Sequence, residues 1–270
     1  MEAVINKSQF FDLPKPRLFG HRGNPSRVVE NTLPSFESAL ACGVRYLEMD
    51  LWLTRDGVPV IHHDQYLSRI FGSDAKISDL SLEELKQLTP KESMLPASEN
   101  LSIFNLHDFS VPTFEQVLRH FPQAMFNLDF KLDSFDLVER SLDLILEYNL
   151  QERVLVASEH DHLVDGNSRV LDKNIPFALG YRKTREFFDW ISGNMEDSFD
   201  TSGSALQIPE FYDGHRLMSA DNLKIAHDMG FEVHVWTVND REKVREFLEM
   251  RVDGIMSDDP EMLVQGANSA

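Results

Sequence analysis

The chain has 270 residues, and 42% of them are hydrophobic, which supplies enough apolar side chains for a sizeable core and excludes a disordered chain. Its 45 acidic residues outnumber the 26 Lys and Arg, so the formal net charge of −19 disfavours nucleic acid as a partner. The single cysteine, Cys42, excludes an intramolecular disulfide and a thiolate metal cluster, and its apolar surroundings predict that it is buried.

No segment of the sequence predicts insertion into a membrane. No apolar run reaches the roughly 20 residues that a spanning helix needs. The opening residues also lack the basic start and apolar run of a signal peptide. We therefore expect no stable membrane insertion and a cytoplasmic location.

Eight short apolar runs alternate with amphipathic helical patterns and predict β-strands. They are Leu18–Gly20, Tyr46–Leu53, Met125–Phe130, Val154–Ala157, Phe177–Gly180, Ala205–Ile208, Glu232–Thr237 and Gly254–Met256. Helices are predicted between the later strands, over Thr184–Ser192, Ser219–Met229 and Asp240–Glu249. Repeated strand–helix units favour the α/β class with a closed (β/α)₈ barrel of the TIM type. A doubly wound open sheet is the alternative, but no G-x-G-x-x-G motif follows the first strand.

Two features interrupt the alternation after the second strand. Asp56-Gly57 lies between two apolar runs and predicts a hairpin with a two-residue turn. The polar stretch from about residue 72 to 112 contains one clear helical pattern, Ser81–Leu88, and reads as a small insertion that overhangs the barrel mouth. We therefore predict one barrel domain over residues 1–270, with an inserted subdomain at about 72–112. At the later helices, Asn239 is a candidate N-cap and Gly230 a stop signal.

Charged residues occur on the inward faces of two predicted strands. Glu48 and Asp50 are two apart on the second strand, and Asp129 and Lys131 are two apart on the third, so each pair shares a face. Three carboxylates form an oxygen-only site suited to one hard divalent cation, Mg²⁺ or Ca²⁺. The alternative is a buried ion-pair cluster of Lys131 with the acids.

Further candidates lie where predicted strands end. His21 and Arg22 follow the first strand, where His21 can act as an acid or base and Arg22 can bind a phosphate or carboxylate. The hairpin ends in His62-His63, and because adjacent strand residues face opposite sides, only one of these two can face the site. Trp236 closes the seventh strand and either lines a small-ligand pocket or covers the barrel mouth.

Together these residues resemble the glycerophosphodiester phosphodiesterase family. The similar segments are Phe-Gly-His-Arg-Gly with Glu30-Asn31-Thr32, the stretch from Tyr46 to Asp64, Val-Trp-Thr-Val-Asn-Asp, and Val-Asp-Gly-Ile-Met-Ser-Asp-Asp-Pro. The resemblance runs from about Leu18 to Leu263. It implies hydrolysis of a small-molecule phosphodiester to glycerol 3-phosphate and an alcohol, on a barrel with a subdomain inserted after the second strand.

The resemblance also implies roles for individual residues. His21 and His63 correspond to the acid–base pair, which selects His63 over His62. Glu48, Asp50 and Asp129 correspond to the metal ligands, although the family usually has glutamate at the third position and the related sphingomyelinase D enzymes have aspartate. The remaining correspondences are Arg22 and Lys131 for the phosphate, Trp236 for the glycerol side, and Glu30 for a supporting hydrogen bond or a charge at a helix start.

Three alternatives remain open from the sequence. A lysophospholipase D or sphingomyelinase D-like enzyme would act on lipids, and the Phe-rich stretch from Phe187 to Trp190 could form a lipid-facing loop. A barrel aldolase would use Lys131 as a Schiff base but would leave the acids and histidines without a role. A binding protein without catalysis would retain the same pocket.

Overall fold

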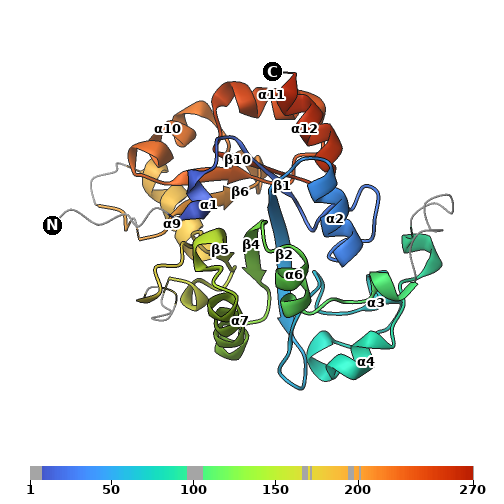
Figure 1. The fold of residues 1–270 in the computed structure, drawn as a ribbon. Helices are drawn as coiled ribbons and strands as arrows, with labels where there is room; N and C mark the ends of the chain where they lie inside the picture. Colours follow the sequence, from blue (N-terminus) through green and yellow to red (C-terminus); the bar gives the residue numbers. More distant parts are fainter. Residues whose placement is uncertain are drawn as a thin grey trace.

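The computed structural model describes residues 8–95, 106–165, 170, 172–193, 198–200 and 202–269. Seven parallel strands adjoin one another in the order β5–β4–β2–β1–β10–β9–β6. They are β1 (Arg17–Gly20), β2 (Tyr46–Leu53), β4 (Met125–Phe130), β5 (Val154–Ala157), β6 (Ala205–Ile208), β9 (Glu232–Val235) and β10 (Gly254–Ser257). The helices lie around the outside of these strands (Figure 1).

A short eighth segment closes the sheet between β5 and β6. Phe177 forms a parallel bridge with Val156, and Ala178 forms one with Ala205. The backbone N–H of Ala178 donates to the carbonyl of Val156 at 2.9 Å, and that of Leu179 donates to the carbonyl of Ala205 at 2.9 Å. The predicted eight-stranded barrel is therefore confirmed, although its fifth strand is limited to two bridging residues.

The helices and the minor elements complete the fold. The α-helices are α1 (Gln9–Asp12), α2 (Leu33–Ala41), α3 (Ser68–Phe71), α4 (Leu82–Lys86), α6 (Phe114–His120), α7 (Phe135–Glu147), α9 (Tyr181–Ser192), α10 (Ala220–Asp228), α11 (Arg241–Met250) and α12 (Pro260–Asn268). The other strands are β3 (Pro59–Ile61), β7 (Phe211–Tyr212) and β8 (His215–Arg216). Single 3-10 turns are η1 (Ile77–Asp79), η2 (Glu92–Met94), η3 (Leu106–Phe109), η4 (Gln151–Arg153) and η5 (Asp161–Leu163). None of the helices in the described part of the chain has the length and apolar character needed to cross a bilayer.

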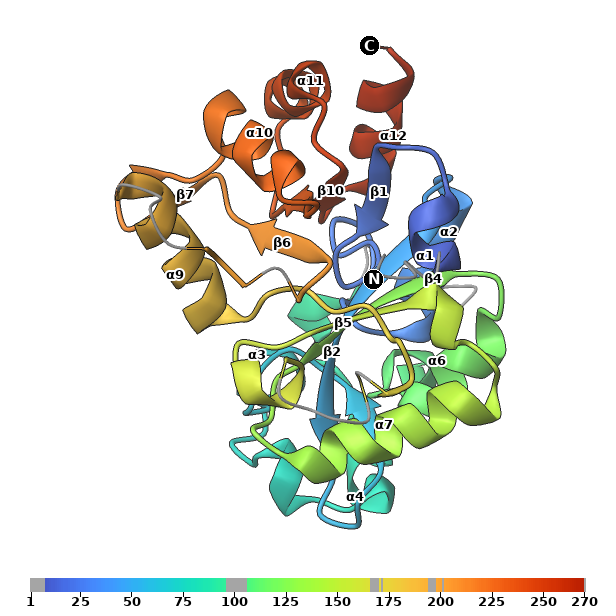
Figure 2. The same ribbon diagram turned by 90° about the vertical axis from the view of Figure 1, so that its left-hand side faces the viewer.

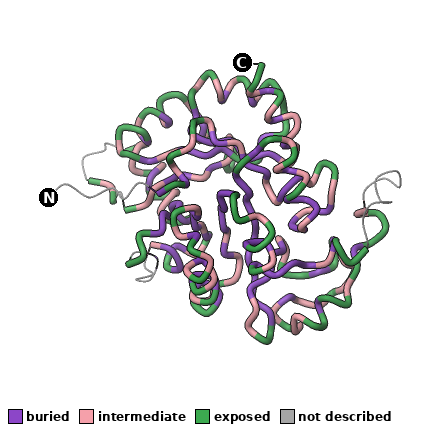
Figure 3. The backbone as a smooth tube through the Cα atoms, in the orientation of Figure 1, coloured by how far each residue is buried: buried purple, intermediate pink, exposed green. Residues whose placement is uncertain are grey.

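The core forms two layers, one inside the barrel and one between the strands and the helices. Apolar residues that alternate along the strands pack against the helices, and the strands at the centre of the molecule are buried (Figure 3). At the amino-terminal end of the barrel, Phe10 from α1 packs against Phe19 and Tyr46 inside it. Apolar side chains therefore fill this end, and the opposite, carboxyl-terminal end is left for a site.

The segment between β2 and β4 leaves the barrel as a hairpin followed by short helices, and Figure 2 shows α4 at the opposite end of the molecule from α11. β3 pairs antiparallel with β2, and Ile77 of η1 and Leu85 of α4 pack with Trp52 and Val60 of the hairpin. Residues 96–105 of the predicted insertion lie outside the described residues.

Several local predictions need correction. The hairpin turn has three residues, because the N–H of Thr54 donates to the carbonyl of Val58 and Gly57 takes the left-handed conformation at φ 79°. α11 is capped by Asp240, which accepts from the N–H groups of Glu242 and Lys243, and not by Asn239. Cys42 is half-buried at the end of α2, since it is the helix's C-cap residue.

Candidate active site

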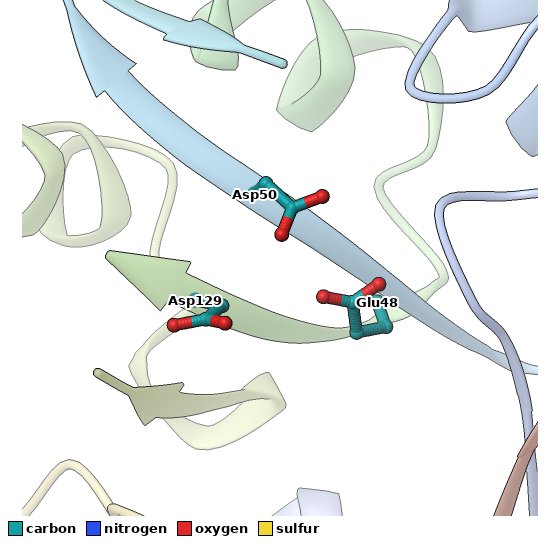
Figure 4. A group of neighbouring side chains, drawn as sticks. All are labelled: Glu48, Asp50 and Asp129. Carbon is teal, nitrogen blue, oxygen red and sulfur yellow. The ribbon is translucent and has the colours of Figure 1, made fainter. Parts of the chain in front are cut away.

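Three acidic side chains converge at the carboxyl-terminal half of the barrel. Glu48 and Asp50 come from β2 and Asp129 from β4, and Asp50 is directly opposite Asp129 in the strand register. One carboxylate oxygen of each lies within 4.8 Å of the others, and Figure 4 shows the three groups around one space. Hard oxygen ligands at this separation fit a divalent cation such as Mg²⁺ or Ca²⁺.

Two cations of the protein lie against these acids. The Nζ of Lys131 is 2.5 Å from Asp129 and 3.1 Å from Asp50, and the Nε of Arg22 is 3.4 Å from Asp50. Burial disfavours the charged form of Asp50, yet Lys131 and Arg22 outweigh it and hold the pKa of Asp50 below its ordinary value. Burial and the Asp50 carboxylate instead raise the pKa of Glu48 to about 7. His21, Lys131 and Arg22 each lower the pKa of Glu48, but together they do not outweigh its burial and the charge of Asp50.

His21 lies beside this cluster, directly after β1. Its Nδ1 is 2.7 Å from Asp258, and its Nε2 is 3.9 Å from Glu48. Asp258 also accepts a hydrogen bond from Asn239 at 2.7 Å. Burial disfavours the protonated ring, but Glu48 and the hydrogen bond to Asp258 outweigh it and raise the pKa of His21.

The backbone at His21 depends on two glycines. A Cβ added at Gly20 would lie 2.6 Å from the carbonyl oxygen of Gly23 and 2.8 Å from the Cβ of Ala39. Gly23 has φ 89°, and a Cβ there would lie 2.4 Å from the Oγ of Ser35. Because α2 packs this closely, the Gly-His-Arg-Gly turn is tight, and the N–H of Arg22 donates to Glu48 at 2.9 Å.

The two adjacent histidines of the hairpin differ sharply in environment. His63 lines the same cavity as His21, and its Nδ1 is 2.7 Å from Asp64. His62 is only 2% exposed and its ring lies 5.7 Å from that of Phe71. Burial lowers the pKa of His62 to about 4, so this ring is a neutral part of the core near pH 7.

Glu30 lies behind the site and does not begin a helix, since α2 starts at Leu33 after the cap Thr32. Its carboxylate accepts from the Nη1 of Arg22 at 3.1 Å and from both Nη atoms of Arg69, at 2.8 and 2.7 Å. Burial disfavours its charged form, but the hydrogen bonds from Arg69 and the charge of Arg22 outweigh it and lower the pKa of Glu30. The reading of Glu30 as a charge at a helix start is therefore wrong.

The three acids, their two cationic neighbours and both His21 and His63 open onto one cavity of about 890 Å³. Its lining includes His21, Arg22, Glu48, Asp50, His63, Asp129, Lys131 and Trp236. Trp236 lies just after β9, which ends at Val235, and its indole is 40% exposed. The cavity extends over the aromatic rings of Tyr181, Phe188 and Tyr212. A volume of this size exceeds what a small head group needs and is typical of sites for drug-sized ligands.

Similarity to known proteins extends along nearly the whole chain. A family model described as "Glycerophosphoryl diester phosphodiesterase family" matches residues 21–262. The chain belongs to this family. It is 28% identical to "Probable glycerophosphodiester phosphodiesterase 2" of Mycobacterium tuberculosis, over 90% of this chain and 87% of the relative. It is 22% identical to "Lysophospholipase D GDPD1" of Rattus norvegicus, over 94% of this chain and 86% of the relative.

Solved structures give the same fold. A phosphodiesterase from Oleispira antarctica, whose structure is described as a complex with the product sn-glycerol-3-phosphate, covers 94% of this chain and 97% of its own, with a TM-score of 0.72 and 21% identity. Membership of the glycerophosphoryl diester phosphodiesterase family confirms the resemblance found in the sequence, together with the expected enzyme class, a phosphoric diester hydrolase.

Sequence reasoning missed the partners that hold the two histidines. Asp258 and Asn239 both lie in segments that carry the family resemblance, and Asp64 follows His63 directly. Their positions were therefore visible, but nothing in the strand periodicity assigned them to the site. Arg69 carried no signal, because its partner Glu30 is 39 residues away in the chain.

Two surface interpretations also change. The Phe-rich stretch from Phe187 to Trp190 is part of α9 and not a loop, and Phe187 is buried in the core. Within the described part of the insertion, residues 72–95 and 106–112 do not line the main cavity. The predicted overhang of this segment over the cavity is therefore wrong for these residues.

Proposed function

We propose that this family member hydrolyses glycerophosphodiesters to glycerol 3-phosphate and an alcohol, by His21 and His63 acid–base catalysis assisted by one divalent cation, Mg²⁺ or Ca²⁺. The supporting observation is that two histidines, each with its Nδ1 on a carboxylate, share one cavity with three clustered acids. Glu48, Asp50 and Asp129 would hold the cation, which when bound supplies positive charge that polarises the phosphoryl oxygens.

The charge balance explains why a cation is needed for binding. A phosphodiester is an anion, and it must approach three carboxylates in a protein of net charge −19. Lys131 and Arg22 neutralise Asp50 and Asp129 in part, and both line the cavity. We assign these two side chains to the phosphate, and Trp236 to the glycerol side. Without a further positive charge, the acids would still repel the substrate.

The chemical step moves two protons. The carboxylate on each Nδ1 accepts its proton, which leaves Nε2 of each ring for proton transfer. One histidine accepts the proton of the attacking hydroxyl, from water or the neighbouring glycerol hydroxyl, as the new P–O bond forms. The other donates its proton to the leaving oxygen as the P–O bond to the alcohol breaks. If a cyclic phosphate forms first, water opens it with the two histidines in exchanged roles.

The test is hydrolysis of glycerophosphocholine, followed by the release of glycerol 3-phosphate. We expect His21→Ala and His63→Ala each to lower kcat by about 10²–10⁴ with an unchanged circular dichroism spectrum. A chelator should abolish turnover, and added Mg²⁺ or Ca²⁺ should restore it. Near wild-type turnover in His21→Ala would refute the acid–base assignment, and full activity in chelator would refute the metal. A folded protein without turnover on any phosphodiester would instead indicate a binding protein.

A lipid phosphodiesterase is the second candidate, of the lysophospholipase D or sphingomyelinase D-like type. The observation that favours it is the size of the cavity and its wall of Tyr181, Phe188 and Tyr212, which could accommodate an acyl chain. Lysophosphatidylcholine assayed beside glycerophosphocholine separates the two, because they share the head group and differ in the chain. A higher kcat/KM for lysophosphatidylcholine would favour the lipid substrate.

The aldolase alternative receives no support from Lys131. A Schiff base requires a neutral amine. Burial alone would favour that neutral form, but the carboxylates of Asp129 and Asp50 outweigh burial and raise the pKa of Lys131. The amine of Lys131 is therefore held in its charged form, which suits binding of a phosphate group and not formation of a Schiff base. Failure of borohydride to trap a carbonyl substrate on the enzyme is the expected result.

We also propose that residues 1–270 form one barrel domain, with an inserted subdomain at about 72–112. The buried residues Ile77 and Leu85 support this division, because they pack on the hairpin residues Trp52 and Val60. Limited proteolysis of the full chain tests it, and the protease should cut within the insertion before it cuts the barrel strands.

A further inference from the structure

Arg69 lies between two carboxylates, and each of them contacts a different group of the proposed reaction. Its Nε donates to Asp64 at 2.6 Å, and its two Nη atoms donate to the two oxygens of Glu30 at 2.8 and 2.7 Å. Asp64 in turn contacts the Nδ1 of His63 at 2.7 Å, and Glu30 contacts Arg22 at 3.1 Å. A single guanidinium group therefore connects the proposed acid–base residue to the proposed phosphate ligand.

The planar fork of arginine is what allows this connection. The two Nη atoms form a bidentate pair with Glu30, and Nε donates a hydrogen bond to Asp64. A lysine ammonium could not hold both carboxylates in the same geometry. The side chain of Glu30 is only 12% exposed, so its charge depends on the two arginines beside it. Burial opposes ionisation of Asp64, but the hydrogen bonds from Arg69 and His63 lower the pKa of Asp64 to about 2.

The backbone that carries Arg69 is fixed from two sides. α3 contains Ile70, which is buried against Val29 and Phe109. Val29 directly precedes Glu30, and Phe109 belongs to the insertion. Leu67, at the start of α3, is buried against Trp52 and Val60 of the hairpin. The insertion and the hairpin thus hold the arginine in place, although Arg69 does not line the main cavity.

We propose that Arg69 is a positioning residue of the reaction, which orients His63 through Asp64 and Arg22 through Glu30. This inference rests on the proposed function. It gives α3 a role in catalysis, because this helix supplies Arg69 although Arg69 itself does not line the main cavity. Loss of Arg69 would leave the carboxylates of Glu30 and Asp64 without their shared cation, so both would turn toward other partners and release the side chains they hold.

The two connections of Arg69, to His63 through Asp64 and to Arg22 through Glu30, predict separable kinetic effects. Loosening of Arg22 weakens contact with the phosphate and raises KM, whereas loosening of His63 slows proton transfer and lowers kcat. Partners that orient such groups are typically worth about 10–100-fold in activity. We expect Arg69→Gln to lower kcat/KM for glycerophosphocholine by about 10–100-fold, divided between both constants. Arg69→Lys keeps the charge but not the fork, and we expect it to recover only part of this loss.

The experiment is a double-mutant cycle, with kcat and KM measured for Arg69→Gln and Arg69→Lys in the wild-type and His63→Ala backgrounds. Arg55→Gln is the matched control, because Arg55 contacts an acid and a backbone carbonyl of the insertion, Glu84 and Asp79, yet is exposed and does not line the cavity. We expect Arg55→Gln to keep wild-type constants. In the His63→Ala background, Arg69→Gln should lower kcat by no more than about twofold, since the residue it acts through is gone.

Each outcome decides between the ideas. An equal loss of kcat from Arg69→Gln in both backgrounds would overturn the role through His63, as would full recovery by Arg69→Lys. If Arg69→Gln has the kcat and KM of the wild type while His63→Ala is impaired, the inference about Arg69 is overturned and the proposed function stands. If Arg69→Gln does not fold, as judged by its circular dichroism, Arg69→Lys carries the same comparison. Absence of wild-type hydrolysis, or a fully active His63→Ala, would overturn the proposed function and this inference together.

Discussion

The two ends of the barrel both carry buried charges, but they balance them differently. At the amino-terminal end, Arg17 is fully buried and pairs with Glu232 at 2.9 Å, while Lys15 and His227 contact Asp253 at 2.5 and 2.6 Å. Each acid there has a cation, and Phe10 fills the adjoining interior. At the carboxyl-terminal end, the acids outnumber Lys131 and Arg22 and adjoin an open cavity.

The difference separates a structural cluster from a functional one. Inward charges occur at both ends, so charge on a strand face does not by itself indicate a site. A surplus of acid beside a cavity does, because the protein bears an electrostatic cost that a bound external cation would relieve. Substitutions at the two ends should therefore have opposite effects on stability and activity.

Glu48→Gln should give the largest effect, at the carboxyl-terminal end. We expect turnover of glycerophosphocholine to fall by about 10³-fold or more, because the proposed cation would lose a charged ligand. The thermal midpoint measured in chelator should stay the same or rise, since a buried carboxylate beside Asp50 is removed. A marked fall of the midpoint in chelator would mean that Glu48 stabilises the fold as the amino-terminal acids do.

Asp253→Asn should give the opposite result at the amino-terminal end. Its buried carboxylate contacts the partly exposed side chains of Lys15 and His227 and accepts the N–H of Val233 at 2.8 Å, so the substitution weakens three contacts of one charged group. We expect a loss of about 2–3 kcal/mol in the free energy of unfolding, measured in urea, with unchanged kcat for the folded enzyme. Asp228→Asn is the matched control, because it removes only an exposed pair with Lys224 and should leave stability unchanged.

The strand pattern accounts for how much of this arrangement was predictable. Period-two spacing put Glu48 with Asp50 and aligned them with the residues of the third predicted strand, so the acid cluster followed from the sequence. The barrel followed from eight strand–helix units, and the choice of His63 followed from the family resemblance. These predictions depend on the regular geometry of strands and helices or on the sequence motifs that the chain shares with the family.

The remaining features depend on contacts between distant loops. Asp258 reaches His21 across 237 residues of sequence, and Arg69 reaches Glu30 across 39. Loops have no periodicity that would indicate such partners, and each contact exists because neighbouring strands bring the segments that follow them together. The strand pattern did not place Trp236 either. The predicted strand ran to Thr237, but β9 ends at Val235, so Trp236 follows the strand and its indole is exposed at the edge of the cavity.

The burial of His62 makes the free energy of unfolding depend on pH. The folded protein keeps His62 neutral down to about pH 4, whereas the unfolded chain protonates it near its ordinary pKa of about 6.5. The unfolded state therefore binds more protons in this window, and stability falls as the pH falls from about 6.5 to about 4, by about 3 kcal/mol at most. His62→Asn should remove this part of the slope in urea unfolding series, while His120→Asn, at an exposed helix end, should retain it.

Trp236→Ala should give the smallest effect, since its side chain is 40% exposed and faces the cavity from one edge only. We expect KM for glycerophosphocholine to rise by about three- to tenfold with kcat nearly unchanged, because the indole contributes contact area and not proton transfer. Phe211→Ala is the matched control, as Phe211 is 55% exposed and does not line the cavity. A fall in kcat as large as that of His63→Ala would mean that the indole orients the reacting groups. Trp236, at the edge of the cavity, would then belong to the functional cluster at the carboxyl-terminal end of the barrel.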